Sequence, residues 1–273
     1  MNDDFSAVLR TFSPISLQAM ERVTLLDRVD RKYIVAIDDL LPLLSKGTSR
    51  YRILQEPGGS GDGAECRAFT YENLYLDTPG FSMYFAHHNG RSVRHKVRLR
   101  RYMETGAAFA EVKKKEKGRT VKTRLELEGS AFMLNEYLEP ARYDRVIGEF
   151  IQTHSPFAAT ELIPAAANSF TRFTLVGSDL DERVTVDTSI AFASPANLTV
   201  WVPLQETAVV EVKSAGSNRD SFLRSGLRLA GYRPQGMSKY CVGMALLYPD
   251  MKYNCFKPTF REITKRSVSD AAS

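Results

Sequence analysis

Residues 91–124 read RSVRHKVRLRRYMETGAAFAEVKKKEKGRTVKTR and hold thirteen Lys or Arg against three Glu. The stretch therefore carries a local charge of +10, in a chain of 273 residues whose total is +5. From Arg94 to Arg100 the cations occupy every second position, with Val97 and Leu99 between them. Side chains at i and i+2 of a strand share a face. The stretch therefore predicts strands with one cationic face and one mostly aliphatic face.

Two arrangements of these strands remain open on the residues alone. In an ordinary antiparallel sheet the aliphatic face packs inward and the charged face meets solvent. Alternatively, a closed barrel of about eight strands turns its cations into an interior tunnel. The tunnel is favoured, because the charged faces are nearly all cationic and a row of like charges repels itself unless a polyanion neutralises it. Glu111 and Glu211 would share the inner face with Lys113 and Lys213.

The tunnel arrangement predicts an aliphatic exterior covered by helices, which are expected at 130–153 and 220–230. The outward set is Val97, Leu99, Val112, Leu125, Leu127, Val210 and Val212.

The predicted fold class is α+β, with a single domain at 14–257 and flexible termini at 1–13 and 258–273. The strands have short connections and should be antiparallel. Gly231 stands where a helix C′ residue would, and Ser238 is the expected N-cap of a helix through Leu247. The absence of a βαβ rhythm, a GxGxxG motif and a Walker A loop argues against a Rossmann or P-loop fold.

The composition, with 43% hydrophobic and 25% charged residues, is that of a globular protein, and the net positive charge favours anionic partners. Cys66, Cys241 and Cys255 lack CxxC spacing, which suggests neither a disulfide framework nor a zinc site. No apolar run approaches the roughly 18 residues of a membrane span, and the first residues lack a signal-peptide pattern. A cytoplasmic location is therefore expected.

Several short motifs follow one another along the chain. They are Asp30-Arg31-Lys32-Tyr33, Tyr75-Leu76-Asp77-Thr78-Pro79, Arg94-His95-Lys96-Val97-Arg98-Leu99-Arg100, Glu111-Val112-Lys113 with Gly118-Arg119-Thr120-Val121-Lys122, and Glu211-Val212-Lys213 with Gly236-Met237-Ser238-Lys239-Tyr240. In this order they resemble the VTC domain, the polyphosphate polymerase domain of the vacuolar transporter chaperone complex. That domain belongs with the triphosphate tunnel metalloenzymes and the CYTH-like proteins. The resemblance runs from about Asp30 to Leu247.

The resemblance implies a closed eight-stranded antiparallel β-barrel, the triphosphate tunnel fold, with helices packed outside. It also implies a metal-dependent phosphotransferase that passes the γ-phosphate of ATP to a growing inorganic polyphosphate chain and releases ADP. The expected cofactor is Mn²⁺, or Mg²⁺ in its place. The expected partners are ATP and inorganic polyphosphate rather than nucleic acid, and family analogy adds a membrane protein that accepts the polymer.

The resemblance further implies the site residues. Those expected to bind phosphate are Lys32, Arg98, Arg100, Lys113, Lys122, Arg172, Arg183, Ser238 and Lys239. Of these, Arg98, Arg100, Lys113 and Lys239 are expected to act in catalysis, and Glu211 is expected to bind the metal. Arg forks match phosphate oxygens bidentately, phosphate-bound hard cations prefer carboxylate oxygen, and the first amides of the helix after Ser238 would add an anion site.

Some cationic and acidic positions keep a second interpretation. Lys122 and Arg124 compete for one place in the tunnel, with Lys122 favoured, and Glu211 could simply pair with Lys213. The CYTH branch carries an ExExK signature, which aligns here with Arg28-Val29-Asp30-Arg31-Lys32. The first acid is replaced by Arg28, which argues against the usual two-metal hydrolysis of triphosphates.

Other residues are expected outside the site. His88 and His95 lack ligand spacing and are expected at the surface, whereas Asp77 and Asp187 are expected to end strands rather than bind metal. Lysines 114, 115 and 117 are expected in a solvated turn.

Three other functions compete with polyphosphate synthesis. A triphosphatase would release phosphate from tripolyphosphate without chain growth, and a sensor would bind polyphosphate or a nucleotide without turnover. Nucleic-acid binding would need an exposed basic patch, and the cationic row lacks the interleaved aromatic residues that stack on bases.

Overall fold

The computed structural model describes residues 3–21, 28–58, 65–127, 138, 145–215 and 221–267. The strands are β1 (Ser13–Ile15), β2 (Arg28–Ala36), β3 (Tyr51–Leu54), β4 (Glu56–Pro57), β5 (Glu65–Cys66), β6 (Phe69–Asp77), β7 (Arg94–Tyr102), β8 (Ala108–Glu116), β9 (Arg119–Leu127), β10 (Ile163–Gly177), β11 (Glu182–Ser194), β12 (Asn197–Pro203) and β13 (Thr207–Ala215). The helices are α1 (Asp3–Thr11), α2 (Leu17–Glu21), α3 (Ile37–Lys46), α4 (Ser82–His88), α5 (Arg145–His154), α6 (Phe222–Leu229), α7 (Lys239–Leu247) and α8 (Lys257–Ser267), with 3₁₀ turns η3 (Ala159–Glu161) and η4 (Asn254–Phe256).

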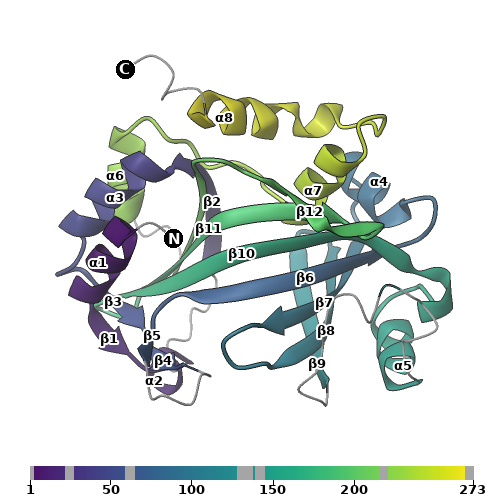
Figure 1. Ribbon diagram of the computed structural model, residues 1–273, viewed down its shortest axis with the longest axis horizontal. Helices are drawn as coiled ribbons and strands as arrows, with labels where there is room; N and C mark the ends of the chain where they lie inside the picture. The colour runs from purple at the N-terminus through teal and green to yellow at the C-terminus, as the bar shows by residue number, and fades with distance from the viewer. Residues whose placement is uncertain are drawn as a thin grey trace.

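One strongly curved sheet organises the described residues (Figure 1). It has 11 strands, and its main path follows the order β2-β13-β11-β10-β6-β7-β8-β9. Every pairing along this path is antiparallel. The hairpin between β8 and β9 turns at Lys117 and Gly118, which have φ of 46° and 82°. Positive φ at both positions suits a tight hairpin, so the turn expected at Gly118 is confirmed.

The expected closed eight-stranded barrel is wrong in two respects, although the α+β class is confirmed. The sheet has more than eight strands, and it is not closed, because β2 and β9 end the main path without pairing with each other. Both edge strands carry lysines on the inner face, Lys32 and Lys122. Like charges placed opposite one another destabilise strand pairing, so a closed ladder would bring two cationic rows together.

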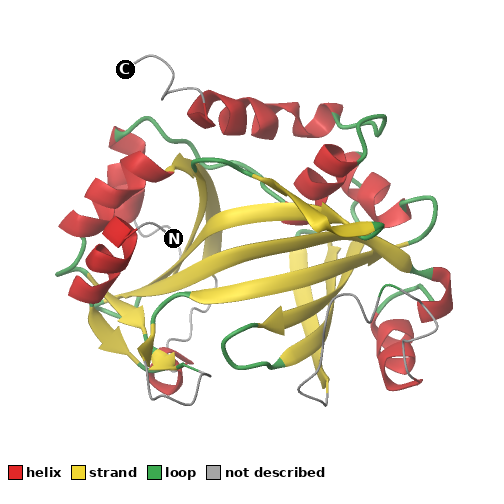
Figure 2. Cartoon of the chain, in the orientation of Figure 1, coloured by secondary structure: helices red, strands yellow, loops and turns green. Residues whose placement is uncertain are grey.

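The aliphatic face of the sheet lies outside and is covered by helices, as the alternation of residues predicts (Figure 2). Ile151 of α5 belongs to one buried cluster with Leu99 and Val112. Leu227 of α6 belongs to another with Val210. These two clusters also contain the rest of the predicted outward set, namely Val97, Leu125, Leu127 and Val212. The first part of the helix expected at 130–153 lies outside the described residues.

The inner face of the sheet carries charged side chains along one part of the strands and apolar side chains along another. On β2, Lys32 faces a cavity, whereas Ile34, two residues later, is buried in an apolar cluster with Phe170 and Val209. Val242 of α7 and Ile263 of α8 belong to the same cluster. Helices α7 and α8 therefore cover one end of the inner face, and the charged side chains occupy the remainder.

The two chain ends are more ordered than expected. Residues 3–11 form α1, and Phe5, Leu9 and Phe12 are each 2% exposed within the core. Their i, i+4, i+7 spacing is typical of a helix with one buried face. Residues 257–267 form α8, whereas 268–273 lie outside the described residues. Among the helices described, none combines the length and the apolar character that a membrane crossing needs.

Truncation of the outer aliphatic face provides a test of this packing. Leu99→Ala removes a fully buried side chain beneath α5, and we expect a loss of roughly 2–5 kcal/mol in the free energy of unfolding. Val121→Ala on β9, where the side chain is 61% exposed, should change it by less than about 0.5 kcal/mol. Urea unfolding followed by circular dichroism measures both. Equal effects would contradict the orientation of the sheet.

Candidate functional site

The sheet encloses a cavity of about 950 Å³ on its inner face. Ten residues singled out from the sequence line it together, and they come from eight different elements. They are Lys32, Arg98, Arg100, Lys113, Lys122, Arg172, Arg183, Glu211, Ser238 and Lys239. Their convergence follows from the period of two along each strand, because residues two apart on β7, β8, β9, β10, β11 and β13 all point inward.

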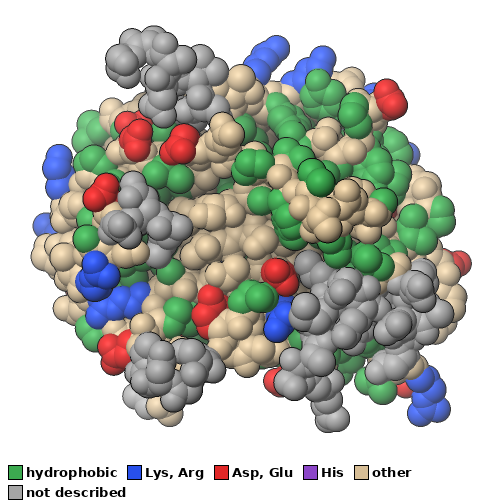
Figure 3. All heavy atoms as spheres, in the orientation of Figure 1, with side chains coloured by type: hydrophobic (Ala, Val, Ile, Leu, Met, Phe, Trp, Pro, Cys, Tyr) green, Lys and Arg blue, Asp and Glu red, His purple; other side chains and the backbone are tan. Residues whose placement is uncertain are grey.

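Further charged residues line the same wall, although they were not assigned to the site. Glu111 and Lys213 were expected on the inner face and Arg124 was considered for it, whereas Asp30, Lys96 and Asp187 were not placed there. Among the described residues, eleven Lys or Arg and four Asp or Glu line the cavity, an excess of seven positive charges. Lys122 and Arg124 both face inward, so the expected competition between them does not arise. On the face shown in Figure 3, the Lys and Arg side chains drawn in colour are instead scattered in small groups.

Glu111 on β8 is the best buried of the acids that bridge two cations, with 2% exposure. Its Oε2 accepts a hydrogen bond of 2.6 Å from Arg98 Nε, and its Oε1 lies 2.5 Å from Lys122 Nζ. Burial alone would raise the pKa of Glu111, but the charges of Arg98, Arg100 and Lys122 lower it to about 2. Glu111 therefore holds cations from the two strands that flank β8.

Asp187 on β11 bridges a second pair. Arg172 on the adjacent strand binds it bidentately, with Nε–Oδ1 and Nη2–Oδ2 distances of 2.6 and 2.8 Å. Lys239, at the start of α7, contacts the same carboxylate. Burial opposes the charged form, yet these two cations lower the pKa of Asp187 well below its usual range. Asp187 does not end a strand as expected, because β11 continues to Ser194.

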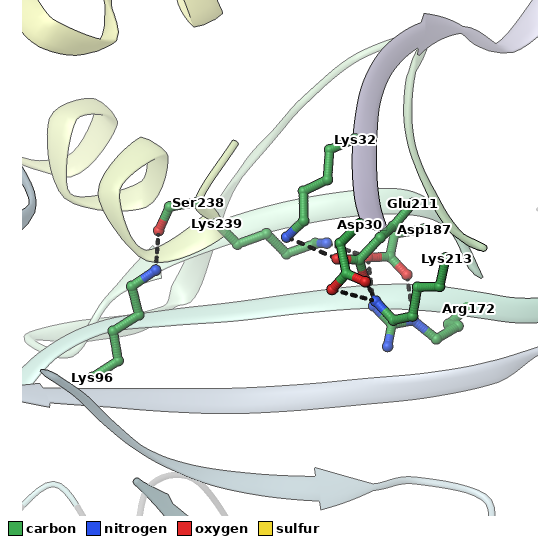
Figure 4. A network of polar contacts seen from close by, with 9 residues as sticks. All are labelled: Asp30, Lys32, Lys96, Arg172, Asp187, Glu211, Lys213, Ser238 and Lys239. Carbon is green, nitrogen blue, oxygen red and sulfur yellow. Dashed lines mark hydrogen bonds and ion pairs between the residues drawn. The ribbon is translucent and has the colours of Figure 1, made fainter. Parts of the chain in front are cut away.

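Glu211 on β13 bridges a third pair (Figure 4). Its oxygens lie 3.3 Å from Lys32 Nζ and 2.5 Å from Lys213 Nζ, and Lys213 also lies 3.5 Å from Asp30. Burial raises the pKa of Glu211, but Lys32 and Lys213 outweigh it and lower the pKa to about 2. The expected alternative of an ion pair with Lys213 is thus present in the structure.

Arg100 is held by an amide and by aromatic rings instead of an acid. Its Nε donates to Oδ1 of the buried Asn73 at 2.8 Å. Its guanidinium lies 5.0 Å from the centre of the Tyr71 ring, which stacks on Phe170. Lys239 Nζ lies 4.3 Å from the centre of the Phe170 ring. Cation–π contacts of this kind hold the two cations in place without occupying a hydrogen-bond donor.

Lysines from three neighbouring strands form a row across the cavity wall. Lys96 on β7 pairs in register with Lys113 on β8, which pairs in register with Lys122 on β9. Burial, together with Lys113 and other cations, lowers the pKa of Lys96 to about 7. Burial and Lys32 lower that of Lys113 to about 8, although its side chain is open to the solvent of the cavity. A bound anion would favour the charged forms.

Helix α7 places two of the predicted residues at the cavity. Ser238 is its N-cap, as expected, and accepts a hydrogen bond from the backbone N of Cys241. Ser238 Oγ also accepts a hydrogen bond of 2.8 Å from Lys96. Gly243 lets the helix approach β11, because a Cβ there would lie 2.5 Å from the Phe192 ring. This close approach brings Lys239 over Asp187.

His88 and His95 are buried, at 8% and 9% exposure, so their expected surface positions are wrong. His88 packs against Tyr84 and Phe256. Asp77 ends β6 as expected, and its carboxylate accepts hydrogen bonds from the backbone of α4 and contacts Tyr240.

The described residues contain no group of three His, Cys, Asp or Glu side chains arranged to hold a metal ion. Glu211 and Asp30, which share Lys213, are the carboxylates that fit a cation best. Mg²⁺ commonly binds through one or two carboxylates together with phosphate oxygens. The donor set therefore fits a metal that arrives with its phosphate ligands.

The chain is similar to a known protein family and to solved structures. A family model of the VTC domain matches residues 27–248. The fold is similar to that of HpAC1 from Hippeastrum, a protein assigned as an adenylyl cyclase and described as having a dominant triphosphatase activity. The TM-score is 0.51 and the identity 15%, over 83% of this chain and 100% of that chain. A Bacillus halodurans protein assigned as an adenylate cyclase gives a TM-score of 0.49 and 13% identity, over 78% and 96% of the two chains. No curated protein gives a significant match.

These findings concern the family and the fold of the chain. They confirm the resemblance stated for the motifs between Asp30 and Leu247.

The Glu111 bridge predicts a pH dependence of stability. Because its pKa falls from 4.5 to about 2 on folding, the ionised carboxylate stabilises the fold fully above pH ~4.5. This contribution, roughly 3 kcal/mol, is lost as the pH falls toward 2. Glu111→Gln should therefore lower stability at pH 7 and flatten its dependence on pH, as measured by urea unfolding between pH 7 and pH 2.

Glu116→Gln, an exposed change on the same strand, is the matched control. An unchanged profile for Glu111→Gln would show that Glu111 does not hold the two cations as described.

Proposed function

Because the chain belongs to the VTC domain family, we propose that it is a polyphosphate polymerase that transfers the γ-phosphate of ATP to inorganic polyphosphate. The observation that carries this proposal is the excess of seven positive charges among the described residues that line a single cavity. A chain of phosphates, each with a negative charge, matches an extended set of cations far better than a single phosphate would. The reaction depends on positioning and charge neutralisation rather than on a covalent nucleophile.

In the proposed reaction, a terminal oxygen of the polyphosphate chain attacks the γ-phosphorus of ATP. The bond between that phosphorus and the β,γ-bridging oxygen breaks, and ADP leaves. Arg98 and Arg100 on β7, with Lys113 on β8, neutralise the charge on the non-bridging oxygens. Lys239 contributes from the start of α7, where Asp187 and Phe170 hold it.

The bridging acids keep the cations in position before the substrate binds. Glu111 orients Arg98 and Lys122, so fewer side chains lose freedom when phosphate enters. Pre-organised charges of this kind contribute to catalysis because they need no reorganisation during the reaction. Asn73 plays the same part for Arg100.

Glu211, with Asp30, is the proposed metal-binding position. A divalent ion such as Mn²⁺ or Mg²⁺, held by these two carboxylates, would supply positive charge to neutralise the phosphate groups. Lys32 and Lys213 contact Glu211 and add positive charge for the phosphate groups beside it.

Hydrolysis of a triphosphate is the second candidate. It is supported by the described triphosphatase activity of HpAC1, which shares the fold. It is also supported by the apolar cluster around Phe170 and Ile263, which covers one end of the inner face, since a short triphosphate needs only one opening. The replacement of the first ExExK acid by Arg28 argues for the polymerase.

Incubation with ATP and Mn²⁺, followed by electrophoresis and staining for polyphosphate, tests the proposal. Wild-type protein should form polymer, and Arg98→Ala should reduce the rate by roughly 10²-fold or more, because it removes a cation that faces the transferred group. Glu211→Ala should have a similar effect through loss of the metal carboxylate. Circular dichroism checks that both variants fold.

Arg119→Ala on the outer face of β9, where the side chain is exposed, should retain full activity. Phosphate release from tripolyphosphate without polymer would replace the polymerase by the triphosphatase. If neither reaction occurs although polyphosphate binds, the sensor becomes the correct interpretation. Full activity in both Arg98→Ala and Glu211→Ala would exclude the assigned site.

The lowered pKa of Lys96 predicts that anion binding depends on pH. At a pKa of about 7, the side chain loses its charge as the pH rises from 6 to 9, so affinity for tripolyphosphate should fall. Lys96→Met should reduce this fall by roughly tenfold in Kd, measured by calorimetry. The titration of the ligand itself is common to both proteins. Lys114→Met, at a surface pair with Glu116, should behave as wild type.

A further inference from the structure

A second, smaller cavity lies on the outer side of β2, behind the wall of the main cavity. It has a volume of about 150 Å³, and four of its eight lining residues are arginines. Arg31 comes from β2, Arg224 and Arg228 from α6, and Arg233 from the segment that follows α6. No Asp or Glu is among the described residues that line it. We propose that this cavity binds phosphate groups of a free inorganic phosphoanion, separately from the main cavity.

The four arginines are brought together by a well-defined backbone. Arg31 alternates with Asp30 and Lys32, so it points outward where those two residues point into the main cavity. Arg224 and Arg228 are four residues apart and therefore share a face of α6, while Leu223 and Leu227 on the neighbouring face are buried in the core.

The segment after α6 closes the site. Gly231, with φ of 82°, ends the helix and turns the chain back toward β2. The Tyr232 hydroxyl accepts a hydrogen bond of 3.1 Å from the backbone N of Ala36. The backbone N of Gln235 donates one of 2.8 Å to the carbonyl of Lys32. These bonds anchor the segment at both sides of Arg233 and fix it beside β2.

The polar groups that line this smaller cavity favour an anionic ligand. Nη1 of Arg31 is buried and has no hydrogen-bond partner among the described residues. A buried donor without a partner is costly, and a bound anion would satisfy it. The side chains of Tyr33 and Ser225 add hydroxyl groups to the lining. Clustered guanidinium groups repel one another, and phosphate oxygens match their fork geometry bidentately.

The size of the cavity limits the ligand. Sites for drug-sized molecules usually measure roughly 300–1,000 Å³, so 150 Å³ suits one or two phosphate groups rather than a nucleotide. Inorganic phosphate and pyrophosphate are therefore the proposed ligands. Because Arg31 lies between Asp30 and Lys32 on one strand, occupancy of this site would also fix the strand that carries two residues of the main cavity.

Calorimetric titration with pyrophosphate tests the proposal, independently of any turnover. Wild-type protein should bind two equivalents, one in each cavity. The double variant Arg228→Ala, Arg233→Ala changes two exposed side chains and should lose one equivalent. The double variant Arg98→Ala, Lys239→Ala should lose the other and keep the outer one.

Arg145→Ala, which removes one charge from an exposed pair on α5, should keep both equivalents. Arg31→Lys preserves the charge but not the forked guanidinium group, and it should weaken pyrophosphate binding at the outer site at least tenfold. A single equivalent in wild-type protein, unchanged by Arg228→Ala, Arg233→Ala, would overturn the proposal. So would an equal loss in Arg145→Ala. Neither result would bear on polyphosphate synthesis in the main cavity, which the activity assays address.

Discussion

The structure depends on three acids that each hold two cations on the concave side of a curved sheet. Glu111, Asp187 and Glu211 bridge neighbouring strands or a strand and α7, and without them the rows of lysine and arginine would repel one another. The acids offset only part of the charge. Eleven cationic and four acidic residues among the described lining leave a surplus, and an anionic ligand is what completes the balance.

The same alternation that produces this surplus also produces the outer core. Every inward cation on β7 has an outward neighbour such as Val97 or Leu99, which needs a helix to cover it. Helix α5 fulfils this role for β7 and β8, and α6 does so for β13. Burial of the aliphatic face, at about 25 cal/mol per Å² of apolar surface, is the favourable term that offsets the concentration of like charge on the other face. The helices that bury the aliphatic face therefore help to stabilise the fold against repulsion within the basic cavity.

The orientation of the sheet could be predicted from the sequence because it depends on period two within single strands. Long-range partners could not be predicted, because they depend on the register between strands. Asp187 meets Arg172 only because β10 and β11 pair in one particular register, and no local pattern shows it. Lys96 and Lys213 did lie in the alternating rows, so their signal was present. Barrel closure failed as a prediction because neither the alternation within single strands nor the family resemblance carries information on whether the edges β2 and β9 of this chain pair. The helical spacing of Phe5, Leu9 and Phe12 was a visible signal for α1.

The open edge of the sheet bears on how a polymer could leave the site. The inner face is covered at one end by α7 and α8, where Ile34, Phe170 and Ile263 pack together. A growing chain of phosphates cannot pass through such an apolar cluster, because each charged group would have to shed its hydration there. Since β2 and β9 do not pair, the wall is interrupted on one side, and both edges carry inward lysines, Lys32 and Lys122. On the proposed function, these edges offer the polymer a cationic route out of the cavity.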